Sequence, residues 1–255
     1  MSINVHTLIN VLKGDFMSNI VFHAANTRGN ADHGWLNAHH SFSFAGYYDP
    51  SRIHFGALRV LNDDIVDGGE GFGKHPHDNM EIITIVLEGS LEHKDSMGHT
   101  QAIYPGEVQV MSAGTGIFHS EYNHDDTEKV NLLQLWIFPD KKNVQPRYDQ
   151  TYFAPEDMVN KLQMLVSPID NDDAGLKIHQ DAWIYRTTLQ AGQTVNHNLH
   201  SNKHGVYVFV ISGNVSANGQ VLGKRDAAGI SDTEKLELTA SEESDVLLVE
   251  VPMQV

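Results

Sequence analysis

From residue 53 onward the chain is divided into short apolar segments that are separated by Gly, Asn, Asp and Pro. Examples are IHFGALRVL (53–61), MEIITIVLEG (80–89), EVQVMSAG (107–114) and VNLLQLWIF (130–138). Turn residues that recur every 8–12 residues or so, with little helical periodicity between them, are typical of β-sandwiches and β-barrels. The sequence therefore predicts an all-β protein.

The strand pattern occurs twice. Residues 82–111 and residues 206–231 each contain an apolar strand, a glycine, a second strand, a polar turn and a later strand led by glycine. This similarity predicts a duplicated β unit. We expect an N-terminal extension without assigned function (1–18), a first domain (19–140), a linker (141–175) and a second domain (176–255). Within the linker, APEDMVNKLQMLV (154–166) has acidic residues where the first turn of a short helix would be.

Charge and composition exclude several classes of function. The chain has 17 Lys and Arg against 33 Asp and Glu, a net charge of -16, which disfavours direct binding to nucleic acids or anionic membranes. It has no cysteine, so any metal must be held by His, Asp or Glu. The beginning of the chain lacks the basic region and cleavage site of a signal peptide, and no apolar run reaches the length of about 18 residues that a membrane span needs. We expect a soluble, cytoplasmic protein.

Two histidine-containing pairs have the spacing of metal ligands on strands. His75 and His77 are two residues apart, so on an extended chain their side chains project to the same face. His119 and Glu121 repeat this spacing. If both pairs point into one barrel, three imidazoles and a carboxylate can hold a divalent transition metal, and an octahedral preference leaves about two positions open.

Most of the 16 histidines must have ordinary roles. We expect surface or structural roles for His39, His40, His93, His197, His200 and His204. A strand that alternates Phe42 and Phe44 with serines is expected to pack in the core, although one of the rings could line a pocket. The DSMG stretch (95–98) is expected to be a hairpin loop.

Two segments resemble the two cupin motifs. In the first, Gly69 is followed by His75-Pro76-His77, by Glu81 and by a glycine at 89, one place later than usual. The second contains Gly106, Gly116, His119 and Asn123, with Ser112 in place of the customary proline and two extra residues before the histidine.

These departures, together with two further segments, resemble the pirin family of bicupins. The segments are HGWLNAHHSFSFAGYYDP (33–50), GFGKHPHDNMEI (71–82), DSMGH (95–99) and MSAGTGIFHSEYN (111–123). The resemblance covers about residues 19–255 and implies two tandem cupin (double-stranded β-helix, jelly-roll) barrels.

The resemblance also implies a ligand set. In pirins the fourth ligand is the glutamate of the second motif, which corresponds to Glu121, whereas most other cupins use that of the first, here Glu81. Spacing alone does not choose, because both glutamates have a parity that lets them face inward. The resemblance favours Glu121, which leaves Glu81 as a pocket group that could orient a ligand histidine.

The second half is expected to hold no metal. Aligning Gly213 on Gly89 places Leu199, Ser201 and Gly205 where the first half has two histidines and a glutamate, and His197, His200 and His204 are out of register.

The reaction that the resemblance implies is that of quercetin 2,3-dioxygenase, in which a metal-bound flavonol reacts with dioxygen and releases carbon monoxide. Glu121 is then the candidate general base for the flavonol hydroxyl. Fe(II) is expected by resemblance, with Mn, Ni, Co, Cu or Zn as alternatives. Two other functions stay open: an iron-dependent regulatory protein that binds a protein partner, and a metal-stabilised scaffold. A monomer is expected, because two cupin units are already joined in one chain.

Overall fold

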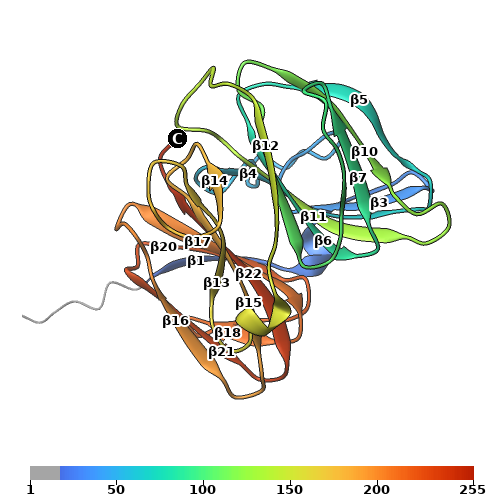
Figure 1. Ribbon diagram of the computed structural model, residues 1–255. Helices are drawn as coiled ribbons and strands as arrows, with labels where there is room; N and C mark the ends of the chain where they lie inside the picture. The colour runs from blue at the N-terminus through green and yellow to red at the C-terminus, as the bar shows by residue number, and fades with distance from the viewer. Residues whose placement is uncertain (1–17) are drawn as a thin grey trace, which may run out of the picture.

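The computed structural model describes residues 18–255 and is built from β-strands (Figure 1). Its only helical elements within that range are two single turns, η1 (Ala25–Thr27) and η2 (Pro155–Asp157). The all-β prediction is confirmed. The extension expected at the start of the chain lies, apart from residue 18, outside the described residues.

The first barrel consists of a seven-stranded sheet, in the order β12-β9-β6-β11-β4-β3-β2, and a four-stranded sheet, in the order β5-β10-β7-β8. The strands of the larger sheet are β2 (Gly29–Asp32), β3 (Leu36–His40), β4 (Leu58–Val66), β6 (Glu81–Glu88), β9 (Glu107–Ser112), β11 (Val130–Ile137) and β12 (Arg147–Tyr152). Those of the smaller sheet are β5 (Gly71–His77), β7 (Leu91–Asp95), β8 (Thr100–Ile103) and β10 (Ile117–Asn123).

The second barrel repeats this plan, with a seven-stranded sheet in the order β1-β20-β17-β22-β15-β13-β14 and a four-stranded sheet in the order β16-β21-β18-β19. The strands of the larger sheet are β1 (Asn19–His23), β13 (Gln163–Pro168), β14 (Leu176–Ile178), β15 (Trp183–Leu189), β17 (His204–Ser212), β20 (Ala227–Ser231) and β22 (Ser244–Pro252). Those of the smaller sheet are β16 (Thr194–Asn198), β18 (Val215–Ala217), β19 (Gln220–Leu222) and β21 (Lys235–Ala240). The two halves thus share one architecture, as the sequence predicts.

One strand, β1, precedes the first barrel in the chain but belongs to a sheet of the second barrel. In Figure 1 the blue strand β1 lies among the orange strands of the second barrel, where it pairs antiparallel with β20. The segment 141–175, expected to be a linker, contributes β12 to the first barrel and β13 to the second. In place of the expected short helix there is only the turn η2, because the apolar residues at the end of the segment 154–166 belong to β13. We therefore propose a domain boundary between β12 and β13, with β1 assigned to the second barrel.

Three hydrophobic layers hold the molecule together. Each barrel has an interior core, and a third core lies between the two large sheets. On β17, for example, Val206 and Val208 pack inside the second barrel, while Tyr207 and Phe209 pack in the core between the sheets. Burial of both faces explains why such strands have continuous apolar runs rather than strict alternation.

A glycine ends the corresponding strand of each barrel. Gly89 follows β6 with φ 75° and Gly213 follows β17 with φ 85°, a left-handed conformation that glycine adopts without steric cost. A Cβ on Gly89 would lie 2.5 Å from the carbonyl oxygen of Lys129, so this turn also requires close backbone approach. The alignment of these two glycines in the sequence therefore corresponds to equivalent turns in the structure.

A separate finding concerns membranes: no helix within residues 18–255 has the length and apolar character to cross one.

Candidate metal centre

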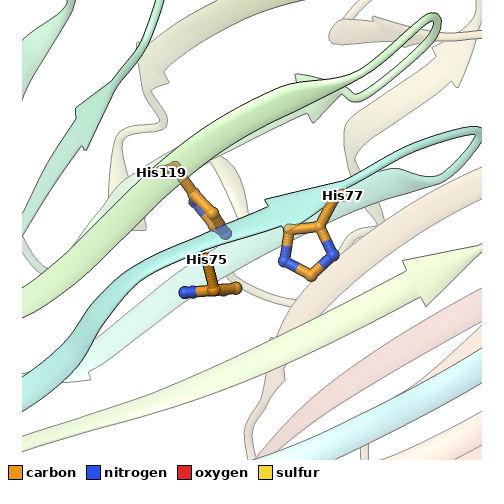
Figure 2. Close-up of side chains that lie close together, drawn as sticks. All are labelled: His75, His77 and His119. Atoms are coloured by element: carbon orange, nitrogen blue, oxygen red, sulfur yellow. The ribbon is translucent and has the colours of Figure 1, made fainter.

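Three imidazoles from two neighbouring strands of the first barrel face one another (Figure 2). His75 and His77 project from the same face of β5, and His119 projects from β10, where it lies opposite His75 in the antiparallel pair. The ring centroids are 4.4 to 4.8 Å apart, and one ligand nitrogen from each ring lies within 4.8 Å of the others. The spacing seen in the sequence thus produces a real cluster.

The hydrogen bonds of these rings leave nitrogens available in the cluster. His75 Nδ1 lies 2.7 Å from the carbonyl oxygen of Gly73 and can only donate to it, so its Nε2 carries a free lone pair. His119 Nε2 is buried and has no hydrogen-bond partner among the described residues. A buried nitrogen without a partner is costly. The donor set therefore fits a divalent metal ion.

Burial also sets the charge of the rings. It lowers the pKa of His77 to about 4, with help from the neighbouring imidazoles His119 and His75. Burial likewise lowers the pKa of His119 to about 3. Both rings are therefore neutral at neutral pH, which is the form that ligates metals.

Glu121 lies beside this cluster and not opposite His75 or His77. A bulge between His119 and Glu121 shifts the register, so that Glu121 pairs with Phe72. Its carboxylate groups with His119 and His93 within 4.8 Å. The structure thus brings together the three predicted histidines and places the fourth predicted ligand at their edge.

Gln134 on β11 holds this carboxylate. Its Nε2 donates to both oxygens of Glu121, at 3.0 and 2.8 Å. The indole of Trp136 donates to Gln134 Oε1 at 3.3 Å, which fixes which end of the amide faces the carboxylate. Glu121 is therefore oriented by two residues of β11 that alternate with its apolar positions.

A cavity of about 440 Å³ opens onto the cluster. Four aromatic side chains line it, namely Trp35, Phe44, Phe72 and Trp136, together with polar groups from β4, β5, β10 and β11. Phe44 packs edge-on against Trp136, whereas Phe42 is 1% exposed and lies in the core between the sheets. One of the two phenylalanines therefore has the expected core role and the other lines the pocket.

A second acidic group lines the cavity. Asp64 on β4 is buried, and burial, with the nearby carboxylates of Asp63 and Glu121, raises its pKa to about 8. Its Oδ1 has no hydrogen-bond partner in the part of the chain that the structure describes. At neutral pH this side chain is protonated in most molecules and can donate a hydrogen bond.

The role considered for Glu81 is wrong. The turn at 78–80, in which Asn79 has φ 45°, separates β5 from β6, so the alternation that places His75 and His77 inward does not continue. Glu81 accepts a hydrogen bond from Ser112 Oγ at 2.7 Å, and it shares its strand face with Ile83 of the core between the sheets. It does not orient a ligand histidine.

Sequence reasoning missed His93. It was expected to be surface or structural, but it is 0% exposed, and its Nδ1 lies 3.5 Å from Nδ1 of His119. His93 Nε2 lies 3.4 Å from Asp95 Oδ2, which also contacts Nδ1 of His99 at 2.8 Å. The available signal was the alternation of His93 and Asp95 on one strand face, directly before the loop.

The histidines of the second barrel form a different cluster. His197, His200 and His204 surround Glu250, which is 0% exposed, with nitrogen to oxygen distances of 2.6 to 2.9 Å. Trp183 stacks on the ring of His200 at a centroid distance of 3.7 Å. Ligands about 2.1 Å from one ion would lie about 3 Å or more apart, so distances this short are those of direct hydrogen bonds. The expected lack of metal in the second half stays a prediction.

Comparison with known families matches both halves of the chain. The family described as "Pirin" matches residues 21–137, and the family described as "Quercetinase C-terminal cupin domain" matches residues 164–251. The second match agrees with the repeated architecture seen in the strands.

Two relatives extend over nearly the whole chain. A protein of Escherichia coli strain K12 named quercetin 2,3-dioxygenase is 46% identical over 91% of this chain and 99% of its own length. A pirin-like protein of Caulobacter vibrioides is 42% identical over 87% of this chain and 95% of its own length.

A solved structure agrees with the fold. The bacterial pirin YhhW from Escherichia coli, in complex with nickel(II), superposes with a TM-score of 0.87 at 45% identity, covering 93% of this chain and 100% of that one. The two-barrel architecture is thus found in an experimentally determined relative of high identity.

Proposed function

Because this chain belongs to the pirin family, we propose that it is a quercetin 2,3-dioxygenase whose active site is the cluster in the first barrel. A flavonol and dioxygen are its substrates, and the flavonol ring is opened with release of carbon monoxide. The observation that carries the proposal is the convergence of three imidazoles, two of which line a cavity with aromatic walls.

His75, His77 and His119 would hold one divalent metal ion, with Glu121 as the fourth ligand. When bound, the ion supplies Lewis acidity and a template for a flavonol oxygen and dioxygen. Fe(II) remains the predicted ion, and Mn, Ni, Co, Cu or Zn are alternatives. A relative that was crystallised with nickel(II) supports a divalent transition metal without choosing among these.

The cavity suits a flat aromatic substrate. Its volume of about 440 Å³ is within the range of small-molecule sites, and aromatic rings from two strands and two loops provide stacking surfaces. The protonated Asp64 offers a hydrogen-bond donor inside this apolar space. Hydroxyl and carbonyl groups on the ligand would find partners there, which favours a hydroxylated ring system over a purely apolar one.

Glu121 is our candidate for the general base. Its carboxylate is held by Gln134 at the edge of the imidazole cluster, within the cavity lining. From that position it can accept a proton from a substrate hydroxyl, provided that the hydroxyl reaches hydrogen-bond distance. Gln134 would keep the carboxylate in place while the proton moves.

The test is gas exchange by protein purified without a metal-affinity tag. The protein is reloaded anaerobically with one metal at a time, quercetin and oxygen are added, and oxygen uptake and carbon monoxide release are measured. His119→Ala is the control. We expect turnover with at least one metal and none in the variant.

No gas exchange from a fully loaded site would contradict the proposal and would favour the regulatory protein that binds a partner. The expectations of a monomer, of a protein partner and of cytoplasmic location stay predictions.

A further inference from the structure

A line of polar groups runs from the metal cluster to the surface of the first barrel. His119 Nδ1 lies 3.5 Å from His93 Nδ1, and His93 Nε2 lies 3.4 Å from Asp95 Oδ2. The same carboxylate contacts His99, whose side chain is 39% exposed. His93 and Asp95 are therefore the buried links between a predicted metal ligand and the solvent.

The carboxylate of Asp95 is fixed in place. Its Oδ1 accepts the backbone N–H groups of Met97 and His99, at 2.8 and 3.1 Å, which leaves Oδ2 directed at the two imidazoles His93 and His99. Tyr148 covers this arrangement, with ring centroids 4.9 Å from both His93 and His99. The DSMGH segment is thus a loop that anchors a buried acceptor.

The Asp95 carboxylate determines the direction of the hydrogen bonds between these side chains. An ionised carboxylate can only accept, so His93 must carry its proton on Nε2 to bond Asp95. In the neutral ring the other nitrogen, Nδ1, is then an acceptor. His119 must therefore carry its own proton on Nδ1, which leaves the lone pair on its buried Nε2.

We propose that Asp95, acting through His93, is a positioning pair that fixes the tautomer of His119 in which Nε2 faces the metal cluster. Metal-binding histidines generally donate their second N–H to a partner that fixes the ring and its tautomer. His75 uses the carbonyl oxygen of Gly73 for this purpose. For His119 the acceptor is the imidazole of His93. The tautomer of His93 is in turn set by its hydrogen bond to the Asp95 carboxylate.

This inference rests on the proposed metal site, but part of it can be tested without metal. In the metal-free protein with ¹⁵N-labelled histidines, nitrogen chemical shifts distinguish protonated from unprotonated ring nitrogens. We expect His119 in the Nδ1–H form and His93 in the Nε2–H form. Finding His119 protonated on Nε2 would overturn the proposal, whatever the activity of the enzyme.

Two substitutions separate positioning from packing. His93→Gln keeps an acceptor for His119 and a donor for Asp95, whereas His93→Leu removes both. We expect His93→Leu to lower metal affinity by roughly 10- to 100-fold, and His93→Gln to retain affinity within about threefold of the parent. The measurement is competition against a chelator, with Zn(II) as the probe.

The control is His23→Leu, which removes a buried histidine bonded to the Tyr207 hydroxyl, away from the cluster. It should leave metal affinity unchanged. Equal affinity in His93→Leu and the parent, with loss of metal in His119→Ala, would sink the positioning role while the site stands. Failure of the parent to bind any metal would instead refute the site itself.

Discussion

Both barrels gather histidines around a glutamate, but the two clusters are arranged in opposite ways. In the first barrel three imidazoles face one another, and Glu121 lies at their edge, bonded to the amide of Gln134. In the second barrel Glu250 occupies the centre, and three imidazoles point at its two oxygens. The same residue types therefore give one open and one closed cluster.

The difference lies in which group lacks a partner. The open cluster keeps a buried ring nitrogen, His119 Nε2, that has no hydrogen-bond partner among the described residues. In the closed cluster the carboxylate charge is already met by imidazole N–H groups, and the interaction with Glu250 raises the pKa of His204 although burial alone would lower it. Residue composition is therefore not enough to predict a metal site, and the prediction that only the first barrel holds an ion rests on the position that the open cluster leaves free.

The largest expected effect is the loss of metal from the open cluster. His119→Ala removes a ligand and no part of the hydrophobic cores, so we expect metal affinity to fall by more than the roughly 100-fold typical of a ligand's hydrogen-bond partner. Unfolding should stay cooperative. Metal analysis and thermal unfolding check this, with His197→Ala as the matched variant in the closed cluster. A metal content equal to the parent would remove the basis of the comparison.

Glu250→Gln should instead affect stability and leave metal binding intact. Burial alone would raise the pKa of Glu250, but the hydrogen bonds from the three imidazoles outweigh it and lower the pKa to about 2, from an ordinary value of 4.5. A shift of this size corresponds to roughly 3 kcal/mol of unfolding free energy at neutral pH. Denaturant unfolding of both proteins measures the loss.

The pH dependence of this difference has a defined sign. Because the pKa is lower in the folded state, the contribution of Glu250 is complete above about pH 4.5 and is lost as the pH falls toward 2. The gap between parent and Glu250→Gln should therefore narrow on acidification. A gap that is constant from pH 7 to pH 3 would mean that Glu250 is held by packing and not by its charge.

Substituting the two glutamates of the first barrel sharpens the comparison further. Glu121→Gln should weaken metal binding by roughly 30-fold, about 2 kcal/mol, because it removes a charged ligand. Glu81 accepts a hydrogen bond from Ser112 away from the cluster, so Glu81→Gln should leave metal affinity unchanged. Chelator competition measures both. The reverse order would mean that Glu81 is the ligand and that the fourth position follows the ordinary cupin pattern.

The smallest effect is expected at Gln134. Gln134→Met keeps the shape of the side chain but removes the N–H donors that orient Glu121, so we expect roughly a tenfold loss of metal affinity, about 1.4 kcal/mol. Trp136→Phe is the companion variant: it keeps a ring in the cavity wall and removes only the indole donor to Gln134, so it separates the orientation of the amide from the amide's own bonds to Glu121. A gain of affinity in Gln134→Met would show that the amide holds Glu121 away from the ion.

The predictable part of the site is the part carried by local strand geometry. His75 and His77 share a face because a strand alternates, and His119 joins them because β10 pairs with β5. Glu81 has the same parity, yet the turn at Asn79 starts a new strand and the alternation is broken. Parity is therefore a guide only within one uninterrupted strand.

Contacts between distant segments were not predictable. Gln134 reaches Glu121 from another sheet, and nothing in the spacing of β11 indicates that its one central amide faces a carboxylate. The strands in the expected linker could not be predicted for the same reason. β12 forms because it pairs with β9, and its own sequence has no strong apolar pattern. These features depend on the assembled barrels.

The core between the two large sheets has a consequence for how such a chain can change. Side chains of both barrels share it, among them Ile83 and Leu133 of the first and Phe209 and Leu247 of the second. The large sheet of the second barrel thus covers the outer face of the large sheet of the first. The first described strand, β1, pairs with β20 and so belongs to this covering sheet. Loss of the second barrel would therefore expose the apolar face of the sheet that lies behind the predicted metal site.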